Sequence, residues 1–135
     1  MSAVVQAERF IYETLAFDTE LMGLVQGVYR DAVPDGAQYP CVRFALYGNG
    51  RTLRDRGGRL LWSRLEFLVT VIGEGESRTG LEAAADRIEA LLHRARAPQQ
   101  GVLQVLKTLP LAFEERDGGQ TWQHLGAVYE VLVGS

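Results

Sequence analysis

The segment from Leu60 to Ile72 constrains the fold most, because its alternation of side chains predicts one long β-strand. One side of that strand is apolar and carries Leu61, Leu65, Phe67, Val69 and Val71. The other side is mixed and carries Trp62, Arg64, Glu66, Leu68, Thr70 and Ile72. These thirteen residues, at about 3.3 Å each, would span roughly 43 Å, about twice the length of a usual strand. We therefore predict that the first half of the strand projects beyond the core as one arm of a hairpin.

An arginine-rich segment, residues 51–59, directly precedes this strand. Its charged residues are Arg51, Arg54, Arg56, Arg59 and Asp55, so four positive charges and one negative charge leave +3. Like charges at this spacing repel one another unless solvent or an acidic partner compensates them. Two interpretations follow: a solvated hairpin tip, or a surface that contacts an acidic partner subunit or DNA phosphates. The candidate interface also includes two residues at the start of the long strand, Trp62 and Arg64.

Helical spacing of apolar residues predicts three helices. Their ranges are 3–17, 19–25, and from 77 or 79 to about 95. Asp18 is the predicted N-cap of the second helix, because an aspartate side chain accepts hydrogen bonds from free amides at a helix start.

Three more segments predict strands, at residues 41–47, 102–113 and 121–133. A charged turn, residues 114–120, joins the last two as a hairpin. The order helix, helix, strand, strand, helix, strand, strand indicates an α+β fold. We predict one domain, residues 1–135, with a mostly antiparallel or mixed sheet of about four strands, two or three helices on one face, and a long projecting hairpin.

The strand at 102–113 predicts one face lined by Leu103, Val105, Leu109, Leu111 and Phe113. Pro110 lies on the opposite face and indicates an edge strand or a bulge, because proline has no amide hydrogen to donate to a neighbouring strand. Apolar residues on both faces of the predicted sheet leave one face without cover from the helices. An exposed apolar face of this kind indicates a partner surface, and closed homo-oligomers use such surfaces head to tail to form rings.

Candidate catalytic residues are few, and the sequence predicts no enzyme, no metal site and no cofactor. His93 falls at a helix end, and His124 lies in the final strand, where a cross-strand pairing role is expected. The single cysteine, Cys41, is expected to be a small buried residue. No segment reaches the ~18 uncharged apolar residues that span a bilayer, so we expect synthesis in the cytoplasm and no membrane contact.

The whole chain resembles the tail terminator, or tail-completion, proteins of long-tailed phages and related particles. The most recognisable block is residues 28–42, with the layout Val-Pro … Tyr-Pro-x-Val at Val33, Pro34, Tyr39, Pro40 and Val42. Residues 65–72, the helix at 81–93 and residues 117–124 before a final strand are similar to the middle and end of the family pattern.

The resemblance implies a structural virion protein with no cofactor. Such a protein caps the tail tube as a homo-oligomeric ring, a hexamer in this family, and joins the tail to the head connector, or stopper, protein. Its partners would be copies of itself, the tail tube protein and the connector, with passing contact to DNA in the ring lumen. Two alternatives stay open: another neck or connector subunit, and a nucleic-acid-contacting module that uses the arginine-rich segment.

Overall fold

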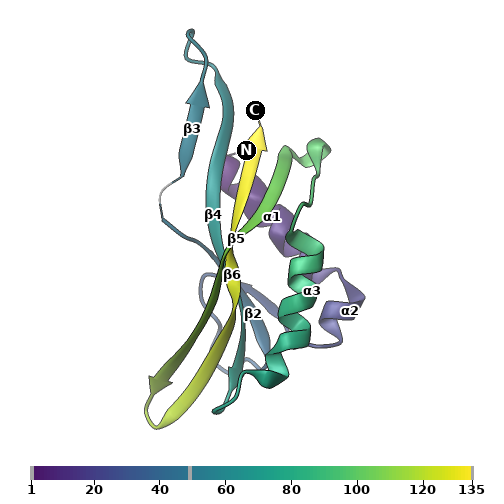
Figure 1. Cartoon of the computed structure of the whole chain (residues 1–135), viewed down its shortest axis with the longest axis vertical. Helices are drawn as coiled ribbons and strands as arrows, with labels where there is room; N and C mark the ends of the chain where they lie inside the picture. The colour runs from purple at the N-terminus through teal and green to yellow at the C-terminus, as the bar shows by residue number, and fades with distance from the viewer. Residues whose placement is uncertain (1, 49, 135) are drawn as a thin grey trace.

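The computed structural model describes residues 2–48 and 50–134. It contains one sheet of six strands with the helices on one side of it (Figure 1). The helical elements are α1 (Ala3–Ala16), α2 (Thr19–Met22), η1 (Thr79–Leu81), α3 (Glu82–Leu92) and η2 (Pro98–Gln100), where η denotes a 3₁₀ turn. The strands are β1 (Val28–Arg30), β2 (Cys41–Leu46), β3 (Arg51–Arg54), β4 (Leu60–Glu74), β5 (Val102–Asp117) and β6 (Gln120–Gly134).

The strand order across the sheet is β1-β2-β4-β6-β5, and β3 pairs with the start of β4. The β1–β2 pair is parallel and the other pairs are antiparallel. The predicted α+β class, with a mostly antiparallel sheet and helices on one face, is confirmed. The sheet has six strands where about four were predicted, because β1 and β3 are too short, at three and four residues, to give an alternating pattern.

The core lies between the sheet and the helices. Four of the five residues predicted for the apolar face of β4 are buried: Leu65, Phe67, Val69 and Val71 are each at most 5% exposed, whereas Leu61 is 40% exposed. They belong to one buried cluster with Ile11 and Leu15 of α1 and Ile88 and Leu92 of α3. Burial of each such side chain contributes about 1.5–3 kcal/mol, so this contact positions both long helices on the sheet.

The start of α2 agrees with local capping chemistry. Asp18 is the N-cap of α2, as predicted, and accepts a hydrogen bond from the Leu21 amide at 2.9 Å. The third predicted helix is shorter than expected, because η1 precedes α3 and α3 ends at Leu92 instead of near residue 95. The chain leaves the helix there since Arg94 adopts a left-handed φ of 68° and its amide bonds to the Val105 carbonyl of β5.

β5 is an edge strand with a bulge beside Pro110, so both structures that the proline indicated are present. The register shifts between Lys107 and Leu109, which pair with Tyr129 and Val128. The prediction that five apolar residues of this strand share one face was therefore wrong. The bulge leaves Val105 on the helix side and turns three later apolar residues, Leu109, Leu111 and Phe113, toward the uncovered side.

Both ends of the sheet carry a projecting hairpin, seen at opposite ends of the long axis in Figure 1. The projection of β4 is shorter than predicted, because β6 pairs with it from Trp62 to Glu74 and only Leu60 and Leu61 lie beyond. The predicted turn at 114–120 is also shorter: β5 continues to Asp117, and the turn needs only Gly118 and Gly119, both with positive φ.

Candidate functional site

The arginine-rich segment forms β3 and the turn that leads into β4. Arg51 lies directly opposite Arg64, and Leu53 lies opposite Trp62. The turn is closed by Asp55, whose Oδ1 accepts hydrogen bonds from the amides of Gly57 and Arg59, both at 2.9 Å. One aspartate therefore orders the apex of this hairpin, residues 51–64, which we call the arginine hairpin.

The four arginines of residues 51–59 are not neutralised within the described part of the chain. None of Arg51, Arg54, Arg56 and Arg59 forms an ion pair with a carboxylate in residues 2–48 and 50–134. The Arg54 guanidinium donates from Nη1 to the Gly58 carbonyl at 3.0 Å, which holds this group beside the turn. The local charge of +3 is thus available to an external partner.

The other two residues of the predicted interface, Trp62 and Arg64, lie next to each other at the base of the arginine hairpin. The Arg64 guanidinium lies 5.3 Å from the centroid of the Trp62 ring, within range of a cation–π contact. Arg64 Nε also lies 3.5 Å from Glu130 Oε1 on the neighbouring strand β6. Glu130 was not predicted, because its position beside Arg64 depends on the β4–β6 register across a long sequence separation.

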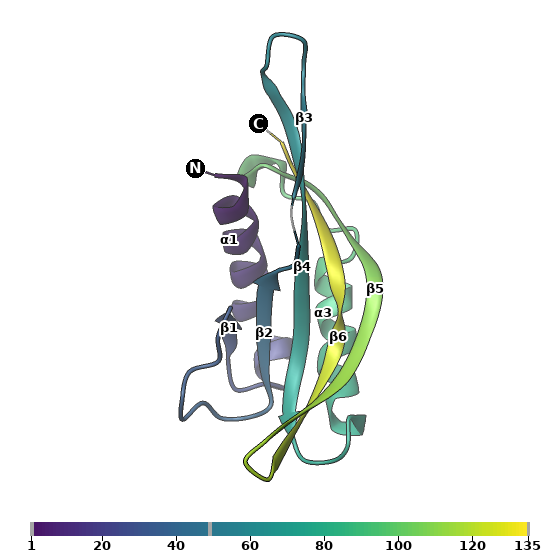
Figure 2. The same ribbon diagram turned by 90° about the vertical axis from the view of Figure 1, so that its left-hand side faces the viewer.

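The face of the sheet turned toward the viewer in Figure 2 has no helix over it. Its β5 edge exposes large apolar side chains: Leu109 is 49% exposed and Phe113 is 38% exposed. In the centre of this face Val128 lies opposite both Leu68 and Leu109. The second face expected from the sequence to lack helix cover is therefore present, and large apolar side chains are exposed along its β5 edge.

A pocket of about 420 Å³ occupies the far end of this face, away from the arginine hairpin. Its aromatic and imidazole lining comes from Tyr39, Phe113, Trp122 and His124. Its charged lining comes from Arg43, Glu115 and Asp117. The Phe113 and His124 rings stack at a centroid distance of 4.2 Å with an angle of 14° between their planes, which confirms the predicted cross-strand role of His124. We call this site the aromatic–acidic pocket.

His124 is 3% exposed, and burial lowers the pKa of its imidazole below the ordinary 6.5 despite its contact with Glu115. The Nε2 atom lies 2.9 Å from Glu115 Oε1. Because an ionised carboxylate only accepts hydrogen bonds, Nε2 carries the hydrogen and Nδ1 is left as an acceptor in the neutral ring. No described residue donates to that Nδ1 atom.

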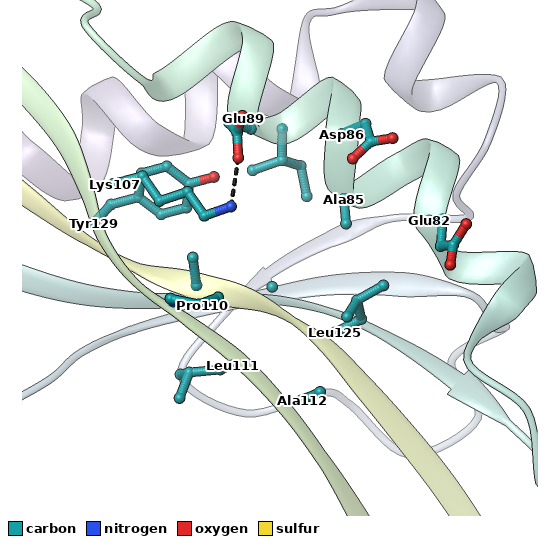
Figure 3. A pocket seen from close by; sticks show the side chains of 13 residues that line it. Glu82, Ala85, Asp86, Glu89, Lys107, Pro110, Leu111, Ala112, Leu125 and Tyr129 are labelled. Atoms are coloured by element: carbon teal, nitrogen blue, oxygen red, sulfur yellow. Dashed lines mark hydrogen bonds and ion pairs between the residues drawn. The ribbon is translucent and has the colours of Figure 1, made fainter.

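A second groove, of about 450 Å³, runs between α3 and the β5 edge (Figure 3). Glu82 and Asp86 of α3 line one wall, and Pro110 lies on the strand side. Lys107 forms an ion pair with Glu89 at one end of the groove and lowers the pKa of that carboxyl group. Most of the charge in this groove is therefore acidic and comes from one helix.

The described residues hold few groups suited to catalysis. Cys41 is fully buried, and burial raises the pKa of its thiol to about 11, which disfavours the reactive thiolate. His93 Nδ1 accepts the Lys107 amide at 3.0 Å, so this ring joins α3 to β5. Within residues 2–48 and 50–134, no three side chains among His, Cys, Asp and Glu come close enough to form a metal site. None of the described helices is both long enough and apolar enough to cross a bilayer.

No known family model and no curated protein sequence matches this chain. Among solved structures, the fold is found in a protein of the virion of a native gene transfer agent particle. That protein and this chain superpose with a TM-score of 0.69 and share 20% of their residues, over 93% of this chain and 92% of the other. At this level of identity the match shows a shared fold across nearly the full length of both chains.

Proposed function

We propose that this chain is a structural subunit of a phage-like virion, where it acts as the tail terminator. Copies of the chain assemble into a ring at the end of the tail tube and form the surface that meets the head connector. The observation that carries this proposal is the full-length structural match to a virion protein of a gene transfer agent particle, at a TM-score of 0.69.

Two features of the chain itself support an assembly role. The uncovered sheet face exposes apolar side chains such as Leu109, which a neighbouring subunit would bury. The arginine hairpin projects past the end of β6, and its apex carries positive charge that pairs with no described carboxylate, as a contact arm for an acidic surface would. The tail tube protein and the connector are the partners of such a ring, and the virion is its location.

Electron microscopy tests the proposal directly. The purified chain is mixed with purified tail tubes of a phage-like particle, and images are compared with those of tubes alone. We expect rings on one end of the tubes, and tubes of constant length. Rings that bind the head connector and ignore the tubes would instead identify a neck subunit, and a chain that binds neither would overturn the proposal.

Deletion of residues 52–58 tests the arm. The deletion removes the apex of the arginine hairpin and no residue of the buried cluster, so the fold should persist. We expect a normal circular dichroism spectrum and a loss of joined particles. If the deletion variant still yields joined particles at the normal level, the arm is only a solvated tip and the interface lies on the sheet.

The arginines of residues 51–59, which pair with no described carboxylate, also favour a second candidate function, contact with DNA phosphates. Neutralisation of phosphates by arginine releases counterions, so binding would fall steeply as salt rises. Duplex DNA binding by the intact chain and by the Arg54→Glu/Arg56→Glu variant would be compared at several salt concentrations. If the two proteins bind equally, with the same salt dependence, the hairpin does not serve as a DNA contact.

A further inference from the structure

The charges of the chain are separated along its long axis. The arginine hairpin lies at one end, and the β5–β6 turn with the aromatic–acidic pocket lies at the other (Figure 1). Residues 51–59 carry +3, and residues 114–117 carry three carboxylates and one guanidinium, a net charge of −2. Two copies placed end to end would therefore bring opposite charges together.

The strand alternation at the acidic end sorts its charges onto two sides. Glu114 and Arg116 lie on one side of β5 and pair with each other, with Arg116 Nε 2.6 Å from Glu114 Oε2. Glu115 and Asp117 lie on the other side and line the pocket, and Asp117 forms no ion pair in the described part of the chain. The Asp117 carboxylate thus stays available while the nearby guanidinium is occupied, and Glu115 uses Oε1 for its contact with His124.

The lining of the aromatic–acidic pocket suits a guanidinium group. Arginine stacks on aromatic rings and donates to carboxylates in the plane of its fork. The pocket offers the Trp122 and Tyr39 rings beside the Glu115 and Asp117 carboxylates. The His124 ring also lines the pocket, and its Nδ1 atom, which has no donor among the described residues, is itself buried. The one cation in the lining, Arg43, donates to the Asp31 backbone carbonyl, which holds its side chain in place.

We infer that the apex of the arginine hairpin of one copy, with Arg54 and Arg56, docks into the aromatic–acidic pocket of a second copy. The two surfaces differ and lie at opposite ends of the chain, so the contact is heterologous, and a pair of copies keeps one free hairpin and one free pocket. Such a contact continues from copy to copy and closes into a ring when the rotation between neighbours allows it. The inference deepens the proposed function, because it rests on self-assembly and names the contact.

Disulfide trapping tests the contact even when it is weak. The full chain would carry Arg56→Cys together with Asp117→Cys, and Cys41 would stay in place because it is fully buried. The two new thiols lie at opposite ends of one copy, so they can link only different copies. We expect a ladder of multimers on a non-reducing gel that collapses with reductant. The matched control, Arg56→Cys with Asp86→Cys on α3, should stay monomeric.

A monomer band alone for the Asp117 pair, at the highest soluble concentration, would overturn the inference. A ladder for the Asp86 control that equals or exceeds the Asp117 ladder would also overturn it, and would place the contact in the groove beside α3. Wild-type rings on tail tubes together with failed trapping would leave the proposed function standing and remove only the inference. If multimers are trapped but the chain does not bind tail tubes, the inferred contact stands and the proposed function is overturned.

Charge reversal gives an independent test by sedimentation and electron microscopy on tail tubes. The variants Arg54→Glu/Arg56→Glu and Glu115→Arg/Asp117→Arg should each assemble roughly tenfold less well than the wild type, because each places like charges in contact. An equal mixture of the two variants should assemble again. The acidic hairpin of the first variant then meets the basic pocket of the second, and the basic hairpin of the second meets the acidic pocket of the first. Restoration in the mixture also shows that each variant is folded. Failure of the mixture to assemble would contradict the inference, and Glu82→Arg/Asp86→Arg serves as the control that should assemble normally.

Discussion

Arg51 and Arg64 lie directly opposite each other across the β3–β4 pair, so two guanidinium groups share one face of the hairpin base. Arg64 is compensated by the Trp62 ring and by Glu130, whereas Arg51 forms no ion pair with any described carboxylate. Like charges in directly opposed positions of a sheet destabilise the pair. The isolated chain therefore carries a local cost that an acidic partner would remove.

Replacement of Arg51 by glutamate separates stability from assembly. The new carboxylate would lie opposite Arg64, so the hairpin should gain roughly 0.2–1 kcal/mol. The same change removes positive charge from the arm, so ring formation on tail tubes should fall. Thermal unfolding and electron microscopy measure the two effects. A variant with lower thermal stability and unchanged ring formation would show that Arg51 has a structural role only.

The link between α2 and α3 should control acid stability. Asp18 caps α2 and accepts hydrogen bonds from Arg87 Nε and Nη2 of α3 at 2.9 and 2.8 Å. The Arg87 contact and the Leu21 amide lower the pKa of Asp18 from 3.8 to about 2. Because the folded pKa is the lower one, the stabilisation is complete above pH 4 and is lost as the pH falls toward 2.

Two substitutions at Asp18 separate the cap from the charge. Asp18→Asn keeps a good N-cap and loses the ion pair, whereas Asp18→Ala loses both and should cost about 1–2 kcal/mol for the cap alone. Urea unfolding at pH 7 and pH 3 measures the difference. The wild type should lose more of its stability between these pH values than Asp18→Asn does. If both proteins lose the same stability between pH 7 and pH 3, other carboxylates determine the loss of stability in acid.

Gly126 should tolerate no side chain. A Cβ at this position would lie 2.0 Å from the Val69 carbonyl oxygen and 2.7 Å from the Thr70 Cα, both of which belong to the β4 backbone. Gly126→Ala must therefore push β6 away from β4 in the centre of the sheet, at a cost of roughly 1–3 kcal/mol or more. Gly80→Ala, where a Cβ would meet nothing within 4 Å, is the matched control for the same thermal unfolding measurement. Equal stability of the two variants would contradict this argument.

The sequence predicted what depends on local chemistry. The alternation around Phe67 identified the core face of β4, Asp18 identified a helix start, and Pro110 indicated the edge and bulge of β5. The effect of that bulge was not predicted, because an alternating pattern cannot show which residue is skipped. Val28–Arg30 was missed as well, since a parallel strand of three residues is stabilised by its neighbour and not by its own sequence.

The candidate site also has one part that could be predicted from the sequence and one part that could not. The arginine hairpin is continuous in sequence, and its charge is visible there. The aromatic–acidic pocket draws on Tyr39, Ile72, Trp122 and Phe113, which come from separate parts of the chain and meet only through the strand register. Glu130 reaches Arg64 in the same way. Contacts of this kind require the order of the strands, which residue types and spacing do not contain.

The buried imidazole of His124 should make the chain less stable in mild acid. Burial lowers the pKa of this ring from 6.5, and the neighbouring Arg43 acts in the same direction while Glu115 opposes it. The unfolded chain therefore binds a proton at a higher pH than the folded chain, so stability falls as the pH drops below about 6.5. His124→Phe keeps a ring against Phe113 and removes the titrating group. We expect the melting temperature of the wild type to fall between pH 7.5 and pH 5 and that of His124→Phe to change less. If both proteins show the same pH dependence, the protonation of another group is responsible, and the low pKa of His124 plays no part in it.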